Sequence, residues 1–440
     1  MKRKIVLSVV ITLLSIVGQS RGVIVEDQGS KTESIELAED TLTISTQSPT
    51  SNIQHSNKGH WALQLGFNSS TLHHHDPDVK EICHTYGVNY YDVRFKWRAE
   101  MNTTNPYDRA MGRPHVLVGI MYADYSRLKI YRPETGYHSH IEQIITPYAG
   151  FQFDVLHVGR FKMSLDVING IGYCPHPFND NKNTDQEIIG SQYSIFVGGA
   201  AHIGYRISPN WSMSAGLEVR HYSNGTLDRP NLGANTFGGG VTLSYDFVPQ
   251  PVKYSRSDWH EARSKNDDLY PLRKELYLET TAGVALKALI DRFNIYHSSH
   301  NPLYGSFTTM VAPMWRYHRL HASGIGIDYT YADYVYKIHE YDKMNDVEQP
   351  HYSPHIMGLS ARHEVFYKHI SLAVGVGYYL HKKTGNSAKE HESMVYQTVG
   401  ARYSPAFAKE RLFIGYNVKA HRFSKVDCVQ LVLGYRFHLI

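Results

Sequence analysis

The segment WSMSAGLEVRHYS, residues 211–223, decides the fold because its apolar and polar side chains alternate with the period of a β-strand. Most of the apolar side chains occupy odd positions: Trp211, Met213, Ala215, Leu217 and Val219. The even positions are mostly polar: Ser212, Ser214, Gly216, Glu218, Arg220 and Tyr222. Alternation of this kind is typical of a transmembrane β-barrel, whose outer face meets lipid. We therefore expect the odd face to point to lipid and the even face to the lumen.

Seven further segments before residue 248 alternate in the same way. With 211–223 they predict eight strands, at 61–69, 87–99, 113–123, 141–156, 159–173, 190–206, 211–223 and 235–247. Tight turns such as LHVG (156–159) and SPN (208–210) alternate with longer connections. The connection 100–112 is the exception, because it is moderately long although it lies on the rim of the short turns. Short turns on one rim and long loops on the other favour an outer-membrane barrel. A secreted β-sandwich is the alternative.

The second half of the chain repeats this pattern. Residues 249–273 are charged and read as a linker, after which alternation continues to the C-terminus. Short stretches of the two halves match: GYRISPN (204–210) with GARYSPA (400–406), NGIGY (169–173) with AVGVGY (373–378), and TLSYDF (242–247) with VLGYRF (432–437). An internal duplication explains these matches. We therefore expect an all-β chain of two tandem eight-stranded antiparallel barrels, at 59–248 and 274–440, with one larger barrel as the alternative.

The N-terminal residues predict export. Residues 1–22 combine a basic tip, an apolar run too short to span a bilayer as a helix, and small residues, which is the pattern of a secretory signal peptide. Residues 23–58 are polar without periodicity and predict a flexible lead-in. The aromatic C-terminal strand LGYRFHLI (433–440) resembles the signal that barrel assembly machinery reads, so we expect an outer-membrane location. A net charge of +4 is too slight to imply a nucleic-acid partner.

Cysteines and histidines give weaker signals. Cys83, Cys174 and Cys428 permit at most one internal disulfide, for which Cys83 and Cys174 are the candidates, and three unpaired thiols are the alternative. The run HHHDPD (73–78), with His84, His138 and His140, has residue types that bind metals. Because the chain has 27 histidines, such clusters are common in it, and we predict no metal or other cofactor.

A candidate site lies at the end of 211–223. His221 and Ser223 continue its outward face, and Asn235 falls on the same face of the next strand, across the hairpin. Polar groups on the lipid face are costly unless they act there. A serine beside a histidine, with a third group that orients the ring, is the minimum set for nucleophilic acyl transfer. The non-catalytic alternative is a polar start of a loop with Asn-Gly as turn residues.

The stretch HYSNGTLDRPNLGANT (221–236) resembles the active-site segment of the lipid A 3-O-deacylase family, PagL-like outer-membrane barrels that are also described as acyloxyacyl hydrolases. The resemblance covers roughly residues 60–248. It implies a cofactor-free carboxylic ester hydrolase that removes an ester-linked acyl chain from lipid A, with His221 as general base, Ser223 as nucleophile and Asn224 at the oxyanion-stabilising position. Characterised members have a glutamate as the third residue, where this chain has Asn235. Asp228, in the following loop, is a rival third member.

The second half lacks these residues. When GLEVRH (216–221) is aligned with GYNVKA (415–420), Ala420 stands where His221 does, and His421 has the opposite, lumenal parity. We therefore predict a second barrel that is not catalytic. For the whole protein, the alternative to a lipid A esterase is a non-enzymatic barrel with a structural or binding role and a degenerate site.

Overall fold

The structure is a computed structural model. It describes residues 59–73, 77–100, 103–134, 136, 138–253, 274–289, 302–389, 392–422 and 425–439. The predicted signal peptide (1–22), the lead-in (23–58) and residues 254–273 of the linker lie outside the described residues. Among the described helices, none is long and apolar enough to cross a membrane.

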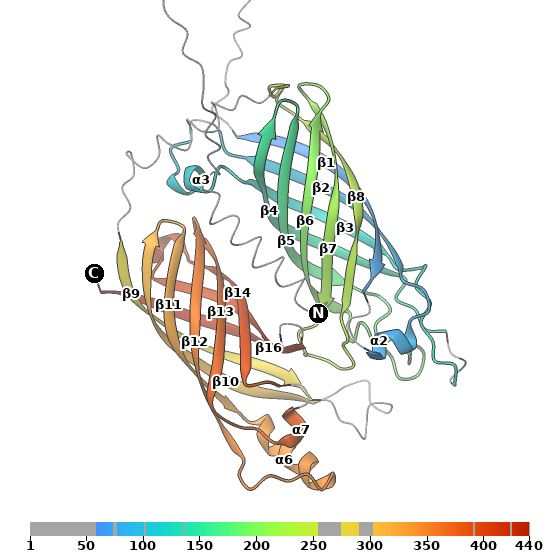
Figure 1. Cartoon of the computed structure of the whole chain (residues 1–440), viewed down its shortest axis with the longest axis vertical. Coiled ribbons are helices and arrows are strands. Elements are labelled where there is room, and N and C mark those ends of the chain that lie inside the picture. Colours follow the sequence, from blue (N-terminus) through green and yellow to red (C-terminus); the bar gives the residue numbers. More distant parts are fainter. Residues whose placement is uncertain are drawn as a thin grey trace, which may run out of the picture. The chain divides into compact units, whose positions relative to one another are not determined.

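Residues 60–246 form a closed antiparallel barrel in which each strand pairs with the next and β8 pairs back with β1 (Figure 1). Its strands are β1 (His60–Leu72), β2 (Gly87–Arg98), β3 (His115–Asp124), β4 (Gln143–Val158), β5 (Phe161–Tyr173), β6 (Tyr193–Arg206), β7 (Trp211–Ser223) and β8 (Ala234–Asp246). Two short helices, α2 (Pro77–Ile82) and α3 (Pro106–Ala110), lie in its connections. The predicted strands are close to these, with ends that differ by up to three residues.

Residues 275–438 form a second closed barrel of the same kind. Its strands are β9 (Glu275–Ala288), β10 (Leu303–His318), β11 (His321–Ala332), β12 (Ser353–Tyr367), β13 (Ile370–Lys383), β14 (Val395–Tyr403), β15 (Leu412–His421) and β16 (Lys425–His438). The connections contain α6 (Tyr334–Met344), α7 (Asn386–Lys389) and η2 (Ala406–Ala408). The prediction of two eight-stranded barrels is confirmed, whereas their origin by duplication stays a prediction.

Burial in β7 and β8 follows the predicted parity. Along β7, Trp211, Met213 and Leu217 are exposed, whereas Arg220 and Tyr222 are buried. Along β8, the odd side chains of Phe237, Val241 and Leu243 are exposed, whereas the even ones of Thr236, Thr242, Ser244 and Asp246 are buried. The apolar side chains therefore point outward, and the polar ones fill the interior.

The interior of the first barrel holds paired charges. Arg94 Nη1 lies 2.9 Å from Asp166 Oδ2, and Gln152 Nε2 donates to Asp166 Oδ1 over 2.8 Å. Near the middle of β7, Glu218 contacts Arg220 and lies 3.3 Å from His202 Nε2. This placement agrees with the lumenal orientation expected for Glu218 and Arg220. A small barrel has room only for side chains, and here they are polar side chains whose charges are largely paired.

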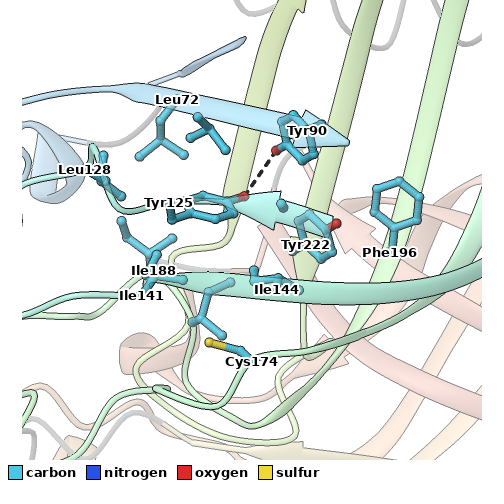
Figure 2. Close-up of a cluster of buried hydrophobic side chains, with 14 of the residues drawn as sticks. Leu72, Tyr90, Tyr125, Leu128, Ile141, Ile144, Cys174, Ile188, Phe196 and Tyr222 are labelled. Atoms are coloured by element: carbon cyan, nitrogen blue, oxygen red, sulfur yellow. Dashed lines mark hydrogen bonds between the residues drawn. The ribbon is translucent and has the colours of Figure 1, made fainter. Parts of the chain in front are cut away.

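The long-loop end of the first barrel is covered by apolar side chains. Residues from the loops 73–86, 125–142 and 174–192 pack with strand residues into one buried cluster: Leu72, Val79, Ile82, Cys83, Val88, Tyr90, Leu117, Met121, Ala123, Tyr125, Leu128, Ile130, Ile141, Ile144, Tyr148, Ile168, Cys174, Ile188, Ile189, Phe196, Tyr222 and Ala234. Figure 2 shows part of this cluster, with the Tyr90 and Tyr125 hydroxyls 3.2 Å apart. The cluster gives the loops a fixed base on the barrel.

The cysteines are unpaired. Cys83, Cys174 and Cys428 are free and buried, and Cys83 and Cys174 both belong to the apolar cluster at the long-loop end. Of the two alternatives for these cysteines, the structure therefore has three unpaired thiols and no bridge between Cys83 and Cys174.

Candidate active site

His221 and Asn235 occupy directly paired positions of β7 and β8. His221 Nδ1 lies 2.7 Å from Asn235 Oδ1. An amide oxygen only accepts hydrogen bonds, so Nδ1 carries the ring proton and Nε2 is left as the basic nitrogen of the neutral ring. The contact therefore selects the tautomer that a general base needs.

The lumenal side chains behind this pair hold the two strands in place. Tyr222, next to His221, has its hydroxyl 2.9 Å from Thr146 Oγ1 on β4. The Tyr90 hydroxyl lies 2.8 Å from Thr236 Oγ1 on β8, and the Arg220 guanidinium stacks on the Tyr90 ring at 4.1 Å. Because these contacts connect β7 and β8 to other strands, the outward pair is set on a rigid part of the barrel.

Gly233 packs against the His221 ring. Its φ of +80° lies in the left-handed region that favours glycine. A Cβ atom at this position would lie 3.3 Å from both His221 Cε1 and the Tyr222 carbonyl oxygen. Glycine is therefore needed for its backbone conformation and for its close approach to the ring.

Ser223 follows His221 on the same face of β7, at the end of the strand. Its Oγ accepts hydrogen bonds from Asn231 Nδ2 over 2.9 Å and from the Gly225 backbone N–H over 3.2 Å. Asn231 Oδ1 also accepts from the Asn224 backbone N–H over 3.3 Å. Two donors thus converge on the hydroxyl and fix the position of its oxygen.

The Asn224 side chain faces the backbone of its own loop. Its Oδ1 accepts from the Thr226 N–H over 3.0 Å, and its Nδ2 donates to the Asp228 carbonyl oxygen over 3.1 Å. The Asp228 carboxylate accepts from the Arg229 N–H over 2.8 Å. In this arrangement the Asn224 side chain shapes the loop, whereas Asn235 contacts the histidine ring.

The loop 224–233 rests on the loop 174–192. The N–H groups of Leu232 and Gly233 donate to the carbonyl oxygens of Glu187 and Ile188, each over 2.9 Å. At Gly190, an added Cβ would collide with the Pro230 carbonyl oxygen. Burial raises the pKa of the Glu187 carboxyl, although Arg132 Nη1, 2.7 Å away, partly offsets this effect. The donors around Ser223 therefore depend on a second loop far away in the sequence.

Sequence reasoning missed Asn231 and Gly225 as neighbours of the Ser223 hydroxyl. Both belong to the segment that carries the family resemblance, where the Pro-Asn pair at 230–231 was the available signal. Neither lies on a regular strand, so the alternation of side chains along a strand does not predict where they point.

In the second barrel, the hairpin that corresponds to β7–β8 has a much shorter connection. β15 and β16 are joined by residues 422–424, where β7 and β8 are joined by 224–233. His421 is buried, with Nε2 3.6 Å from the Asp427 carboxylate. Ala420 pairs with Val426. In the described part of this hairpin, no outward-pointing histidine lies opposite a polar residue of the neighbouring strand, as His221 lies opposite Asn235 in the first barrel.

Two family models match the chain. One, described as lipid A 3-O-deacylase (PagL), matches residues 84–245, and the other, described as acyloxyacyl hydrolase, C-terminal domain, matches residues 276–439. Together they span most of both barrels.

Solved structures also match, at TM-scores too low to carry an argument. The outer membrane enzyme PagL is 14% identical, with a TM-score of 0.24, over 41% of this chain and 97% of that one. OccD3 (OpdP) of Pseudomonas aeruginosa is 10% identical, with a TM-score of 0.21, over 87% of this chain and 92% of that one. A search of curated proteins found no match.

Proposed function

Residues 84–245 of this chain belong to the lipid A 3-O-deacylase (PagL) family and residues 276–439 to the acyloxyacyl hydrolase C-terminal domain family, and from this premise we propose a serine esterase of the outer membrane. Its first barrel hydrolyses an ester-linked acyl chain of lipid A. The observation that carries the proposal is the outward pair of His221 Nδ1 and Asn235 Oδ1 at 2.7 Å, with Ser223 two residues further along the same face.

In the acylation step, the Ser223 Oγ attacks the ester carbonyl carbon while His221 Nε2 takes the hydroxyl proton. Asn235 holds the Nδ1–H of the ring and so keeps Nε2 basic. The Gly225 N–H and the Asn231 amide, which donate to Ser223 Oγ in the free protein, are the donors that we expect to turn to the oxyanion when the tetrahedral intermediate forms. Asn224 supports this donor pair by fixing the turn that contains Gly225.

Collapse of the intermediate breaks the ester C–O bond. The imidazolium of His221 gives its proton to the departing alcohol oxygen of lipid A, and the acyl group stays on Ser223. In deacylation, His221 takes a proton from water as the water oxygen attacks the acyl-enzyme. It gives that proton to Ser223 Oγ as the acyl C–O bond breaks, which releases the fatty acid and restores the serine hydroxyl. No metal or other cofactor enters these steps.

The surface below His221 suits a substrate that lies in a lipid leaflet. Leu217 and Phe237 project outward with exposed side chains, and Val219 pairs with Phe237 in the register of β7 and β8. An acyl chain that runs along this apolar surface would place its ester at the level of Ser223. Because the chain is already surrounded by lipid, moving it onto this surface releases little hydrophobic free energy, so the surface aligns the tail and the polar groups around Ser223 supply the specificity.

Mass spectrometry of lipid A tests the proposal. Cells that express the protein should lose one acyl chain from lipid A, and cells that express Ser223→Ala should keep it. The matched control is Ser126→Ala, which removes an exposed hydroxyl from the loop 125–142 of the same barrel. Both variants should retain heat-modifiable migration as a sign of folded barrels. An unchanged lipid A profile with the natural protein would instead support the non-enzymatic alternative, in which the exchange of an acid for Asn235 has disabled the site.

The second barrel is proposed to be non-catalytic. Ala420 cannot act as a base, and the buried His421 is paired with Asp427. His421→Ala should therefore leave deacylation unaltered in protein that still folds.

A further inference from the structure

His140, Glu142 and His176 form a compact group at the long-loop end of the first barrel, outside the site of Ser223. All three side chains are exposed, and their ligand atoms lie within 4.8 Å of one another. Glu142 Oε2 lies 3.0 Å from His176 Nε2, and Glu142 Oε1 lies 3.5 Å from His140 Nε2. The two rings are tilted, with centroids 5.2 Å apart. One carboxylate thus faces two imidazole nitrogens that come from different loops.

These distances match the spacing of ligands around a small divalent ion. In a tetrahedral site with bonds of about 2.1 Å, neighbouring ligand atoms lie about 3.4 Å apart. The separations of 3.0 and 3.5 Å, one from each carboxylate oxygen of Glu142, are close to that spacing, and the three ligand atoms lie within 4.8 Å of one another. Two imidazoles and one carboxylate suit Zn²⁺ and similar transition metals better than Ca²⁺ or Mg²⁺, which prefer all-oxygen sites.

A buried amide holds the two histidines at this spacing. The Asn183 side chain is 5% exposed. Its Nδ2 donates to the carbonyl oxygens of His140 over 2.9 Å and of His176 over 3.1 Å, and its Oδ1 accepts from the His140 N–H over 2.9 Å. Gln186 Nε2 donates to the same His176 carbonyl oxygen over 3.1 Å. The backbones that carry the two rings are therefore joined before any ion binds.

Glu142 is fixed by its neighbours as well. Ile141, which separates it from His140, is fully buried in the apolar cluster. The Glu142 backbone has a φ of +60°, unusual for a residue with a side chain, and its carbonyl oxygen accepts from the Tyr125 N–H over 2.6 Å. The buried isoleucine and this backbone bond hold the strained residue where its carboxylate meets both rings.

We propose that His140, Glu142 and His176 bind one divalent transition-metal ion of the Zn²⁺ class, which joins the loops 125–142 and 174–192. Three protein ligands leave a fourth position open to solvent or to an oxygen ligand. The proposal does not rest on the esterase assignment, because none of the three residues belongs to the group around Ser223. The metal site is linked to that group only through the loop 174–192, whose Glu187 and Ile188 carbonyl oxygens accept from the Leu232 and Gly233 N–H groups.

The test uses the full chain without an affinity tag, purified in detergent and treated with a chelator. Zn²⁺ binding is measured by competition with a chromophoric chelator, and Co²⁺ is used as a spectroscopic probe for imidazole ligands. The double variant His140→Ala, His176→Ala should bind one ion fewer than the natural chain. Glu142→Gln should weaken that site at least about tenfold, and Asn183→Ser, which disturbs only the support of the ligands, should weaken it about 10–100-fold.

The matched control is His138→Ala, which removes a histidine of the same loop that meets the Tyr131 ring edge to face and is not among the proposed ligands. It should keep the natural stoichiometry and the natural Co²⁺ spectrum. Hydrogen exchange supplies a second readout. Zn²⁺ should slow exchange at 138–142 and 174–183 in the natural chain and in His138→Ala, but not in the double variant. Equal stoichiometry in the natural chain and the double variant would overturn the proposal, as would exchange in these segments that does not respond to Zn²⁺.

Discussion

Asn235 faces His221 across the β7–β8 ladder, with Oδ1 2.7 Å from Nδ1. The family resemblance implies an acid at this position. An amide fixes the orientation and tautomer of the ring as a carboxylate does. In the proposed reaction it brings no negative charge to stabilise the imidazolium. Substitutions at Asn235 therefore test the positioning of the ring separately from its electrostatic stabilisation.

Asn235→Ala should lower turnover by about 10–100-fold, which corresponds to the loss of a positioning contact of about 1.4–2.7 kcal/mol. Asn235→Glu should equal or exceed the natural protein near neutral pH, because it restores the charge if the longer side chain reaches the ring. The measurement is the rate of fatty-acid release from purified lipid A in detergent. Full activity in Asn235→Ala would remove Asn235 from the site and favour Asp228 or a His221–Ser223 dyad.

Asn231→Ala should lower kcat by about 10²–10³-fold, the usual effect of losing one oxyanion donor. Asn231→Asp is the sharper variant. It keeps an oxygen that accepts from the Asn224 N–H but has no N–H to donate toward Ser223, so it should be as inactive as the alanine variant. If Asn231→Asp kept natural kcat, the amide would serve only to hold the loop. KM should change less than kcat in both variants, because the donor acts mainly on the transition state.

Gly233→Ala should lower turnover by about 10–100-fold without unfolding the barrel. The added methyl group meets His221 Cε1 at 3.3 Å, and the φ of +80° is strained for alanine. A small displacement of a catalytic base is enough for a loss of this size. Gly239→Ala on β8 is the control, since its added Cβ would only approach the Gly216 carbonyl oxygen at 3.8 Å. Equal losses in the two variants would indicate a general effect on the barrel instead.

Cys83 and Cys174 should resist alkylation in the folded protein. Burial raises the pKa of both thiols to about 12. At pH 8 only about one thiol in 10⁴ is then ionised, and the apolar cluster also blocks access. Labelling with a maleimide should proceed only after heat unfolding, whereas Ser126→Cys in an exposed loop should label at once. Migration that changes on reduction would show a bridge and contradict the free thiols.

The strands and the outward face of the site were open to prediction from sequence, because alternation with period two fixes both. His221, Ser223 and Asn235 fall on one face by counting alone, and the structure places His221 and Asn235 in direct register. The donors Asn231 and Gly225, and the group of His140, Glu142 and His176, could not be placed in this way. Their positions depend on how three loops pack over the barrel end, which involves contacts between residues far apart in the chain.

The packed interior of the first barrel has a consequence for the permeability of the membrane that holds it. Arg94, Asp166, His202 and Glu218 occupy the lumen in mutual contacts, and the apolar cluster covers the long-loop end. A hydrated ion or an antibiotic molecule would have to break these pairs and displace the cluster to cross. In a planar bilayer, the lumen of the first barrel should therefore contribute no current steps, so copies of this barrel open no leak through the envelope.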